Sequence, residues 1–410
     1  MGSPDLDVFD LDNLEDPYDL YARLREDSPV HHIPGMDLFL VSRYADVKEA
    51  AGRKEDFSSH LTAFVQANAT GSGGSELVDF GASASTVADV LATADPPDHS
   101  RQRKVVARTF REVNTAAPMI EELASAMLAP LVEAGSIEWM DSLASRLPVH
   151  VIAALLGLPD EDTPRLKQWS DDGVELLSGV ASTERLAQCA ASVFGFVKYL
   201  RENLADAGPG GSAGDAILGT LAEAVQDGSL SDAEATSMAL QLVSAGSDST
   251  GNLIGSAARV LACNPDIQAR VRADTSLLEP FLEEVVRLES PFRGHFRVAS
   301  RDTELASVSI PEGARLFLIW ASANRDPEAF DAPDSVLLDR ANPRDHFGFG
   351  WGIHHCLGAP LARLEARIVT EALIRTTSDI RLDPTAPAPA HIPSLLVRRL
   401  AHVHLVLDPA

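Results

Sequence analysis

A stretch of about thirty mostly apolar residues, between positions 231 and 263, constrains the fold more than any other part of the chain. Its pattern predicts one continuous helix, on the order of 45–50 Å long at a rise of about 1.5 Å per residue. Asn264 and Pro265 follow directly, and we expect the helix to end there because proline cannot continue it. A helix this long and this apolar does not suit a surface, so we expect it at the centre of the protein.

The rest of the chain predicts more helix than strand. Apolar residues recur at spacings of three and four from about residue 99 to 201, as in amphipathic helices. Short runs that favour strands lie at residues 38–41, 307–310, 315–318 and 402–407. Neither an internal repeat nor a linker divides the chain. We therefore predict a single domain over residues 1–410, mainly α with a minor β part.

Charge and cysteine content exclude several classes of protein. The chain has 34 Lys and Arg against 60 Asp and Glu, a formal net charge of −26. A field of that sign argues against binding to nucleic acid or to anionic membrane surfaces. No run of about 18 apolar residues occurs, so we expect no membrane-spanning helix. Three isolated cysteines, Cys189, Cys263 and Cys356, do not suit a disulfide framework and favour a reducing, cytoplasmic location.

One of these cysteines has unusual neighbours. Gly348, Gly350 and Gly352 alternate ahead of Cys356, and such glycines allow a tight turn whose backbone can approach a flat molecule closely. A helical pattern begins at Pro360, so Cys356 lies at or just before a helix N-terminus. Free N–H groups and the positive helix end stabilise a thiolate there. A thiolate of this kind is a good ligand for a soft metal.

Two other interpretations of this segment compete with that one. The first is a buried, inert cysteine, which is the interpretation we adopt for Cys189 and Cys263 in their apolar helical stretches. The second is a zinc site made by His354, His355 and Cys356, but three consecutive residues cannot easily surround one ion tetrahedrally. The order of glycines, cysteine and helix start favours a functional Cys356 over both.

The ten residues from Phe349 to Gly358 resemble the haem-binding loop of the cytochrome P-450 family, especially its soluble bacterial members. Phe349, Gly352, Cys356 and Gly358 match the loop pattern of that family. The resemblance implies the cytochrome P-450 fold, with the long central helix over haem b and Cys356 as the axial ligand of the iron. An axial thiolate donates electron density that favours cleavage of the O–O bond of the co-substrate O2.

A second motif strengthens the resemblance. Glu284 and Arg287 are three residues apart on a predicted helix, so their side chains share one face. Such a pair is most often solvated surface. In the cytochrome P-450 family it is buried near the haem loop and joined by a third residue, which Arg340 resembles. The implied role of the trio is structural, namely to hold the loop that presents Cys356.

The resemblance also implies contacts to the haem. Buried propionate groups require hydrogen-bond donors, and several basic residues match the positions that supply them. The implied cofactor-binding residues are His99, Arg103, Ala245, Gly246, Arg297, His346, Phe349, His354, Cys356 and Gly358.

The long helix carries polar residues at positions 245–250, Ala-Gly-Ser-Asp-Ser-Thr. Burying them costs free energy unless they have partners or a task. One interpretation is a polar cluster that packs helices. The resemblance implies instead an O2 groove beside Gly246, with proton delivery by Asp248 and Ser249 and assistance from Thr250. Ser249 stands where the family usually has threonine, and it lacks the methyl group that restricts rotation.

A basic stripe predicts where electrons enter. Arg101, Lys104, Arg108 and Arg111 follow one another at intervals of three, four and three residues on a predicted helix. A solvated helix face would give the same pattern. In the cytochrome P-450 family this surface is on the cysteine side of the haem, so an acidic ferredoxin would be steered to it. The chain contains neither a nucleotide fingerprint nor a flavin domain, so we expect separate redox partners and otherwise a monomer.

The predicted reaction inserts one oxygen atom of O2 into a C–H or C=C bond of a small, mostly apolar organic molecule. By resemblance, the substrate pocket includes residues 61–87, Arg293 and Leu395. Arg293 either pairs with a substrate carboxylate or extends to solvent, and we favour the second. Ser249 leaves open oxidative coupling, nitration or peroxide-driven oxidation on the same fold. A non-catalytic haem-thiolate ligand-binding protein is the alternative from another class.

Overall fold

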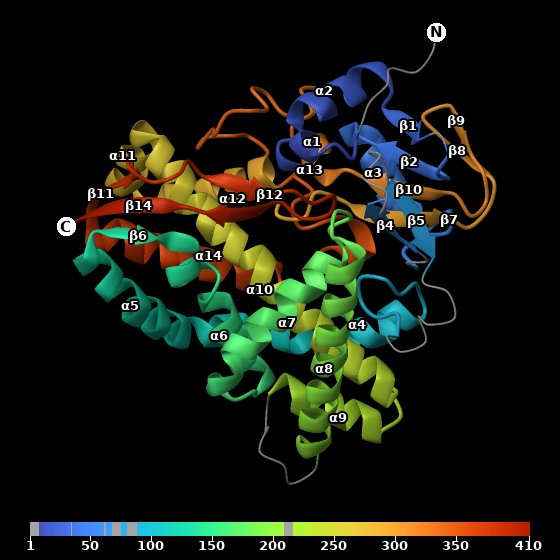
Figure 1. Ribbon diagram of the computed structural model, residues 1–410, viewed down its shortest axis with the longest axis horizontal. Coiled ribbons are helices and arrows are strands. Elements are labelled where there is room, and N and C mark those ends of the chain that lie inside the picture. The colour runs from blue at the N-terminus through green and yellow to red at the C-terminus, as the bar shows by residue number, and fades with distance from the viewer. Residues whose placement is uncertain (1–7, 34, 61–62, 68–74, 80–87, 209–215) are drawn as a thin grey trace.

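A computed structural model describes residues 8–410, apart from 34, 61–62, 68–74, 80–87 and 209–215. The helix α10, Asp232–Cys263, runs through the middle of the molecule (Figure 1). The Ser231 hydroxyl accepts the Glu234 N–H, and the Glu234 carboxylate accepts the Ser231 N–H, so a capping box fixes its start. The helix ends at Asn264, and Pro265 begins α11. The predicted central helix is confirmed.

Helices make up most of the molecule. The N-terminal ones are α1 (Leu11–Glu15), α2 (Tyr18–Asp27) and α3 (Tyr44–Gly52). Those that follow are α4 (Asp98–Arg111), α5 (Ala117–Ala134), α6 (Leu147–Leu156), α7 (Thr163–Leu176), α8 (Thr183–Asp206), α9 (Ile217–Gln226), α11 (Pro265–Ala273), α12 (Leu278–Glu289), α13 (Trp320–Ala323) and α14 (Ala359–Thr376). Short turns are η2 (Val113–Ala116), η3 (Met140–Ala144), η4 (Asp160–Asp162), η5 (Thr275–Leu277) and η6 (Gly352–His354). None of the helices in the described residues is both long and apolar enough to span a bilayer.

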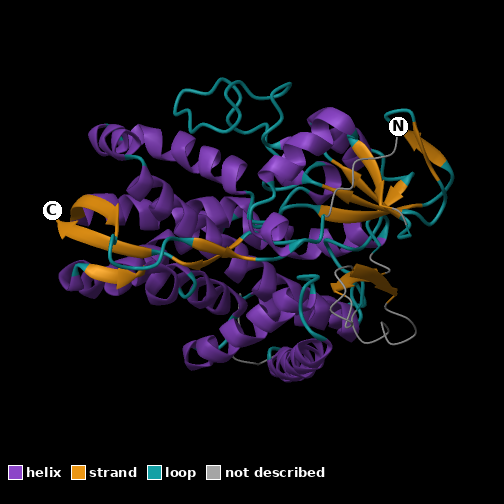
Figure 2. Ribbon diagram, turned by 45° about the horizontal axis from the view of Figure 1, so that its top comes forward, coloured by secondary structure: helices purple, strands orange, loops and turns teal. Residues whose placement is uncertain are grey.

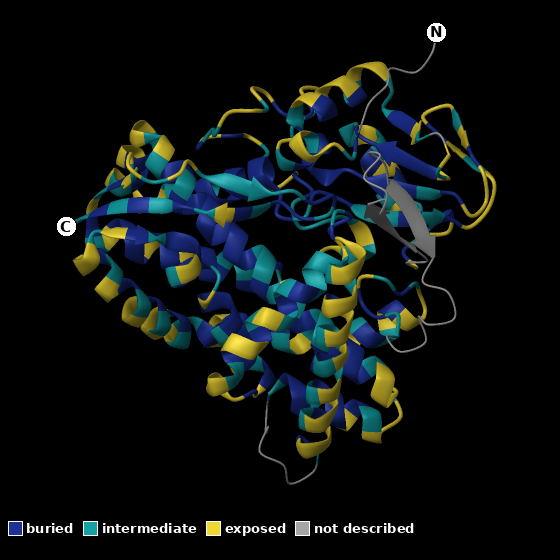
Figure 3. Ribbon diagram, viewed as in Figure 1, coloured by how far each residue is buried: buried dark blue, intermediate teal, exposed yellow. Residues whose placement is uncertain are grey.

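The helices α6, α7, α8, α9, α11, α12 and α14 all contact α10. Gly251 and Gly255 allow another segment of the chain to approach the backbone of α10 closely. A Cβ atom on Gly251 would lie 2.8 Å from the carbonyl oxygen of Ala144, and one on Gly255 would clash with Sδ of Met140. The π-helical turn η3, which contains both of those partners, therefore packs directly on the backbone of α10. Much of α10 is consequently buried, whereas α8 carries exposed residues along its outer side (Figure 3).

Strands gather mainly in two places, one beside the N-terminal helices and one beside the C-terminus (Figure 2). The first is a five-stranded sheet in the order β1 (Val30–Ile33), β2 (Leu38–Val41), β10 (Arg315–Leu318), β7 (His295–Ala299), β3 (Phe57–Ser58). In it β10 runs parallel to β2 and antiparallel to β7. The second is a three-stranded sheet in the order β11 (Thr377–Leu382), β14 (His404–Pro409), β6 (Ser136–Glu138). Two-stranded pairs are β4 (Ala63–Ala67) with β5 (Ser75–Asp79), β8 (Thr303–Leu305) with β9 (Val308–Ile310), and β12 (Ala390–Ile392) with β13 (Arg399–His402).

The predicted strand at residues 402–407 is in fact two strands. β13 ends at His402 and β14 begins at His404. Between them, the N–H of Val403 donates to the Glu138 carboxylate over 2.7 Å, and its carbonyl oxygen accepts the N–H of Trp139 over 2.8 Å. The break arises because a segment far away in sequence takes both backbone groups of Val403. The fold class, mainly α with a minor β part, is confirmed.

Candidate functional site

The loop that carries Cys356 packs tightly against α12. A Cβ atom on Gly348 would clash with the side chain of Val286 and lie 3.1 Å from its carbonyl oxygen, so only glycine fits. Gly350 and Gly352 both have φ of +69°, a left-handed conformation that glycine adopts without strain. We predicted these glycines for approach to a flat molecule. In the structure they serve the turn itself and its packing on α12.

Cys356 follows this turn, just ahead of α14. Its N–H donates to the carbonyl oxygen of Phe349 over 2.8 Å, which closes the loop. The side chain keeps accessible surface although protein atoms surround it. Burial raises the pKa of its thiol, while the N–H groups of Gly358 and Ala359 at the start of α14 lower it. The predicted effect of the helix end is present, but burial outweighs it.

Glu284, Arg287 and Arg340 meet in the interior. Glu284 and Arg287 are fully buried. The guanidinium groups of Arg287 and Arg340 each donate to both carboxylate oxygens of Glu284 over 2.7–3.0 Å. Burial raises the pKa of Glu284, but the two arginines outweigh it and hold this pKa below its usual range. Arg287 also donates to the carbonyl oxygen of Asn324. Because the Asn324 side chain accepts the N–H of Phe347 over 2.6 Å, the trio is linked to the start of the loop.

A group of hydrogen-bond donors lies beside the loop. The rings of His99 and His354 have centroids 4.4 Å apart. His99 Nε2 and His354 Nδ1 are buried without a hydrogen-bond partner in the part of the chain that the structure describes. Arg297 is 5% exposed, and burial lowers its pKa to about 10. Arg297 donates to the Phe296 carbonyl oxygen and His354 Nε2 contacts Ser59, but the two unpartnered ring nitrogens beside a buried guanidinium fit a buried anionic group such as the haem propionates.

His295 belongs to the same group, and sequence reasoning did not assign it there. Trp320 Nε1 donates to His295 Nδ1 over 2.8 Å. Because an indole N–H can only donate, Nδ1 is the acceptor and the ring proton of the neutral imidazole lies on Nε2. Burial lowers the pKa of His295 to about 3, so the ring stays neutral. Its position two residues before Arg297 on β7, on the same face of the strand, was the signal that could have revealed it.

Two predicted haem contacts have protein partners instead. Nε2 of His346 contacts the Glu283 carboxylate at 2.9 Å, and Nδ1 accepts the N–H of Gly348 over 3.1 Å. His346 therefore has no nitrogen left for a propionate, and the structure contradicts its predicted role. Arg103 donates to the carbonyl oxygen of His355 over 2.8 Å, so it lies against the cysteine loop.

The polar residues of α10 are satisfied in different ways. Ser249 Oγ donates to the carbonyl oxygen of Ala245, one turn earlier, over 2.7 Å. Asp248 lies 3.7 Å from Nη1 of Arg399 and accepts from the Asn252 amide over 3.3 Å. Burial raises the pKa of Asp248 despite the nearby Arg399. Asp248 can therefore hold a proton more readily than a solvated aspartate.

Some residues next to Asp248 and Ser249 on α10 are exposed to solvent and others are buried. Ala245 is exposed, and Ser249 one turn later is partly so, whereas Thr250 is only 3% exposed. A Cβ atom on Gly246 would meet Ile152 of α6 at 3.4 Å. This is an ordinary contact on one side of a partly buried residue, so an O2 groove beside Gly246 stays a prediction. Ala245 and Ser249 line the accessible face.

The basic stripe on α4 is shorter than predicted. Arg101 donates to the Glu234 carboxylate on α10 over 2.5 Å and is thereby tied to the protein interior. Lys104, Arg108 and Arg111 remain exposed. The stripe available to a partner consists of these three residues.

Of the two residues expected in the substrate pocket, Arg293 differs from the interpretation we favoured, and the role of Leu395 stays a prediction. Arg293 is 1% exposed and does not extend to solvent, because Nη2 donates to the Glu15 carbonyl oxygen over 3.3 Å beside Tyr21. Leu395 is buried in the cluster that contains Tyr21 and Leu38. Most of the predicted stretch 61–87 lies outside the described residues, which include only strands β4 and β5 there.

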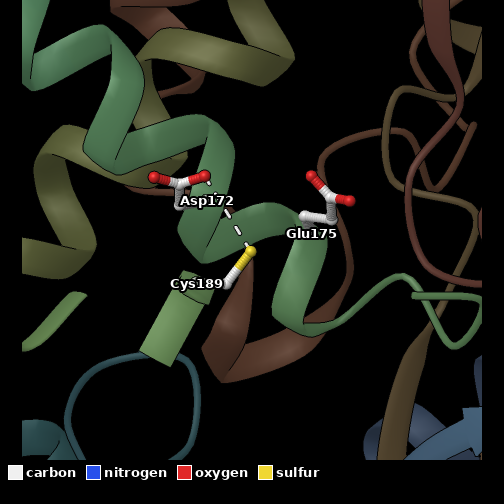
Figure 4. Close-up of side chains that lie close together, drawn as sticks. All are labelled: Asp172, Glu175 and Cys189. Atoms are coloured by element: carbon white, nitrogen blue, oxygen red, sulfur yellow. Dashed lines mark hydrogen bonds between the residues drawn. The ribbon is translucent and has the colours of Figure 1, made fainter. Parts of the chain in front are cut away.

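One acidic cluster outside this region resembles a metal site. Asp172 and Glu175 on α7 lie close to Cys189 on α8, whose thiol donates to Asp172 (Figure 4). Arg185 donates to both carboxylates over 2.7–2.8 Å, and Ser192 donates to Asp172. The arginine offsets part of the charge of the two carboxylates, and burial raises the pKa of Cys189. The cluster is an internal ion pair that needs no metal.

Comparison with known proteins identifies the family. The cytochrome P450 family model matches residues 195–378. Cytochrome P450 144 of Mycobacterium tuberculosis is 39% identical over 403 residues, covering 98% of this chain and 91% of that protein. 6-Deoxyerythronolide B hydroxylase of Saccharopolyspora erythraea is 32% identical over 406 residues, 96% of each chain. The solved structure of cytochrome P450 CREJ with (4-ethylphenyl) dihydrogen phosphate superposes with a TM-score of 0.86 at 27% identity, over 96% of this chain and 97% of that one.

The chain therefore belongs to the cytochrome P-450 family, the enzymes of which are oxidoreductases that use haem b and O2 for monooxygenation. The residues described above fit that cofactor. Haem bound through a thiolate requires an accessible cysteine, and Cys356 is accessible. Its propionates require donors, which the unpartnered buried nitrogens can supply. Its flat face requires open space, and Ala245 is exposed on an otherwise mostly buried helix.

The Glu284 trio gives a first prediction. Glu284→Gln removes the only carboxylate that the structure shows shared by Arg287 and Arg340, so we expect the free energy of unfolding to fall by roughly 3–5 kcal/mol. Glu371→Gln, which loses an exposed pair with Arg367 on α14, should cost under about 1 kcal/mol. Urea denaturation of both variants measures the difference. Equal losses would contradict the structural role of the trio.

Proposed function

We propose that this chain binds haem b through the Cys356 thiolate and inserts one oxygen atom of O2 into a C–H or C=C bond of a small, mostly apolar molecule. The observation that carries the proposal is the pair of buried ring nitrogens without a described partner, His99 Nε2 and His354 Nδ1, beside the closed loop of Cys356. When bound, the haem supplies O2 activation, and an axial thiolate increases the electron density that favours O–O cleavage.

The donors hold the cofactor in this proposal. His99, His354, His295 and Arg297 would hold the propionates, and burial lowers the pKa of each of them. Arg103 adds positive charge from α4 while it holds the His355 carbonyl oxygen. Phe349, Gly358, Ala245 and Gly246 shape the surfaces on either side through backbone and packing.

Asp248 and Ser249 deliver protons, with Thr250 assisting. The Ser249 hydroxyl rests on the Ala245 carbonyl oxygen and can rotate to donate into the accessible face of α10. Asp248 resupplies it, because burial favours its protonated form. Arg399 extends this path outward, since it lies 3.8 Å from Asp171, which is paired with Lys167 near the surface.

Electrons come from a separate acidic ferredoxin that docks on Lys104, Arg108 and Arg111. These residues are exposed on α4, and Arg103 of the same helix contacts the cysteine loop, so the surface is coupled to the ligand side of the site. We further propose a monomer with one catalytic domain over residues 1–410, working in the cytoplasm. Relatives aligned over 98% of the chain support the single domain, and the absence of a disulfide framework supports the location.

The identity of the ligand gives the second prediction. The reduced, CO-bound protein should show the red-shifted absorption band of a thiolate ligand, and Cys356→Ala should abolish it. Cys263 was expected to be buried but is exposed at the end of α10, so Cys263→Ala removes another exposed cysteine and should leave the band unchanged. A band that persists in Cys356→Ala would place the ligand elsewhere.

Proton delivery gives the third prediction. Ser249→Ala should keep NADH oxidation going while diverting it to hydrogen peroxide, because the delivered proton loses its last donor. Asp248→Asn should slow the whole cycle, since resupply is lost. The measurement is product formed per NADH consumed with one substrate. Ser247→Ala is the matched control, because its hydroxyl bonds to Ser170 and Val243 instead.

Two outcomes would redirect this part of the proposal. If Thr250→Ala uncouples the reaction and Ser249→Ala does not, delivery runs through Thr250. If neither matters, oxidative coupling, nitration or peroxide-driven oxidation becomes the better description of the chemistry.

The docking surface gives the fourth prediction. Lys104→Glu and Arg108→Glu should slow reduction by an acidic ferredoxin, and the wild-type rate should fall as salt rises. Lys198→Glu makes the same charge change on α8 and should have no effect. Substrate affinity should stay constant in all three variants. If the reduction rate does not depend on salt and is unaltered in Lys104→Glu and Arg108→Glu, the three basic residues are solvated surface and not a docking site.

A further inference from the structure

Glu283 is a buried acid next to Glu284 on α12, and nothing in the sequence pattern assigned it a task. It is 2% exposed. Three basic side chains, Arg344, His346 and Arg363, surround its carboxylate. Because a buried carboxylate is costly unless it is paired, a group held by three partners indicates a defined role.

Arg363 makes the strongest of these contacts. Its Nε and Nη2 donate to the two carboxylate oxygens of Glu283 over 2.6 and 3.0 Å, a bidentate geometry that fixes the guanidinium plane. That guanidinium lies over the ring of Phe349, with Cζ 4.3 Å from the ring centroid. The carbonyl oxygen of Phe349 accepts the N–H of Cys356. One continuous chain of contacts therefore runs from Glu283 to the backbone of Cys356.

His346 makes a second chain of contacts. Its Nδ1 accepts the N–H of Gly348, so the ring proton must lie on Nε2, which donates to Glu283. Gly348 is the residue that packs directly on Val286 of α12. Glu283 thus fixes both the start of the loop, through His346, and its end, through Arg363.

The charge of Glu283 also reaches the thiol. Burial raises the pKa of Glu283, but hydrogen bonds from His346 and Arg363 outweigh it and lower this pKa to about 2, so the group is ionised. Arg363, which is paired with this carboxylate, is also one of the two arginines near the Cys356 side chain. The carboxylate therefore offsets a positive charge that would otherwise act on the sulfur alone.

We propose that Glu283 is a positioning residue for the Cys356 thiolate, acting through Arg363 and Phe349 to set how strongly the sulfur donates to the haem iron. The inference rests on the ligation of haem by Cys356. It assigns to Glu283 a task separate from that of Glu284, which holds the segment around Asn324, Ser335 and Arg340.

The test compares Glu283→Gln with wild-type holoenzyme and with Glu279→Gln. Glu279 lies one turn earlier on α12 and pairs at the surface with Arg344, the most exposed of the three basic partners, so it makes the same change of charge without removing the Arg363 and His346 contacts. Glu283→Gln should raise the haem reduction potential, because it removes a negative charge that disfavours the more negative reduced state. It should also speed severalfold the loss of the thiolate-specific CO band. Glu279→Gln should do neither.

A purely structural role gives a different result. Glu283→Gln would then lower the thermal midpoint while its potential and the lifetime of its CO band matched those of Glu279→Gln, and the proposal would be overturned. If Glu283→Gln yields no folded protein, Arg363→Lys provides the test. This variant keeps the positive charge but loses the bidentate guanidinium group that lies over Phe349. Faster loss of the band in that variant supports the proposal, and an unchanged lifetime refutes it. A wild-type protein without the thiolate band would instead refute ligation by Cys356.

Discussion

The neutralisation of one buried carboxylate by two arginines organises the ligand side of this protein. An ionised glutamate with no exposure to water is stable only if its partners supply charge and hydrogen bonds together. Arg287 and Arg340 do so at Glu284, and their remaining N–H groups hold carbonyl oxygens between residues 324 and 335. Asn324 passes that order to Phe347, where the cysteine loop begins. The geometry of the loop therefore depends on this ion cluster as well as on the glycines of its own sequence.

The central helix could be predicted because its signal is local. Ser231, Asn264 and Pro265 mark its ends in any context, and the apolar content between them requires burial. The Gly-rich loop, Cys356 and the start of α14 could also be predicted, since a turn, a cysteine and a helix start are adjacent in sequence. These are features that a short window of residues determines.

Contacts between distant segments could not be predicted in the same way. His346 was expected at a propionate, but Glu283, 63 residues earlier, takes its Nε2. Arg293 was expected to extend to solvent, but it is buried and donates to the carbonyl oxygen of Glu15 in α1. Nothing in the sequence distinguishes Arg101 from Lys104. The difference arises only in the folded protein, where Arg101 is paired with Glu234. The sequence assigned roles to Ser249 and Asp248 on α10, but nothing in it indicated that Arg399 lies 3.7 Å from Asp248.

The separation of the partners around Cys356 has a consequence for the order of assembly. Glu283 bonds to residues 63 and 80 positions later, and Glu284 to one 56 positions later. Closing such long loops comes late in folding, because chain entropy opposes them until other contacts exist. The sulfur thus has no fixed place until α12, the segment after Asn324 and the first turn of α14 have docked together. We infer that the nascent chain acquires its cofactor as one of the last steps of its maturation, into a ligand geometry that the polypeptide has already built.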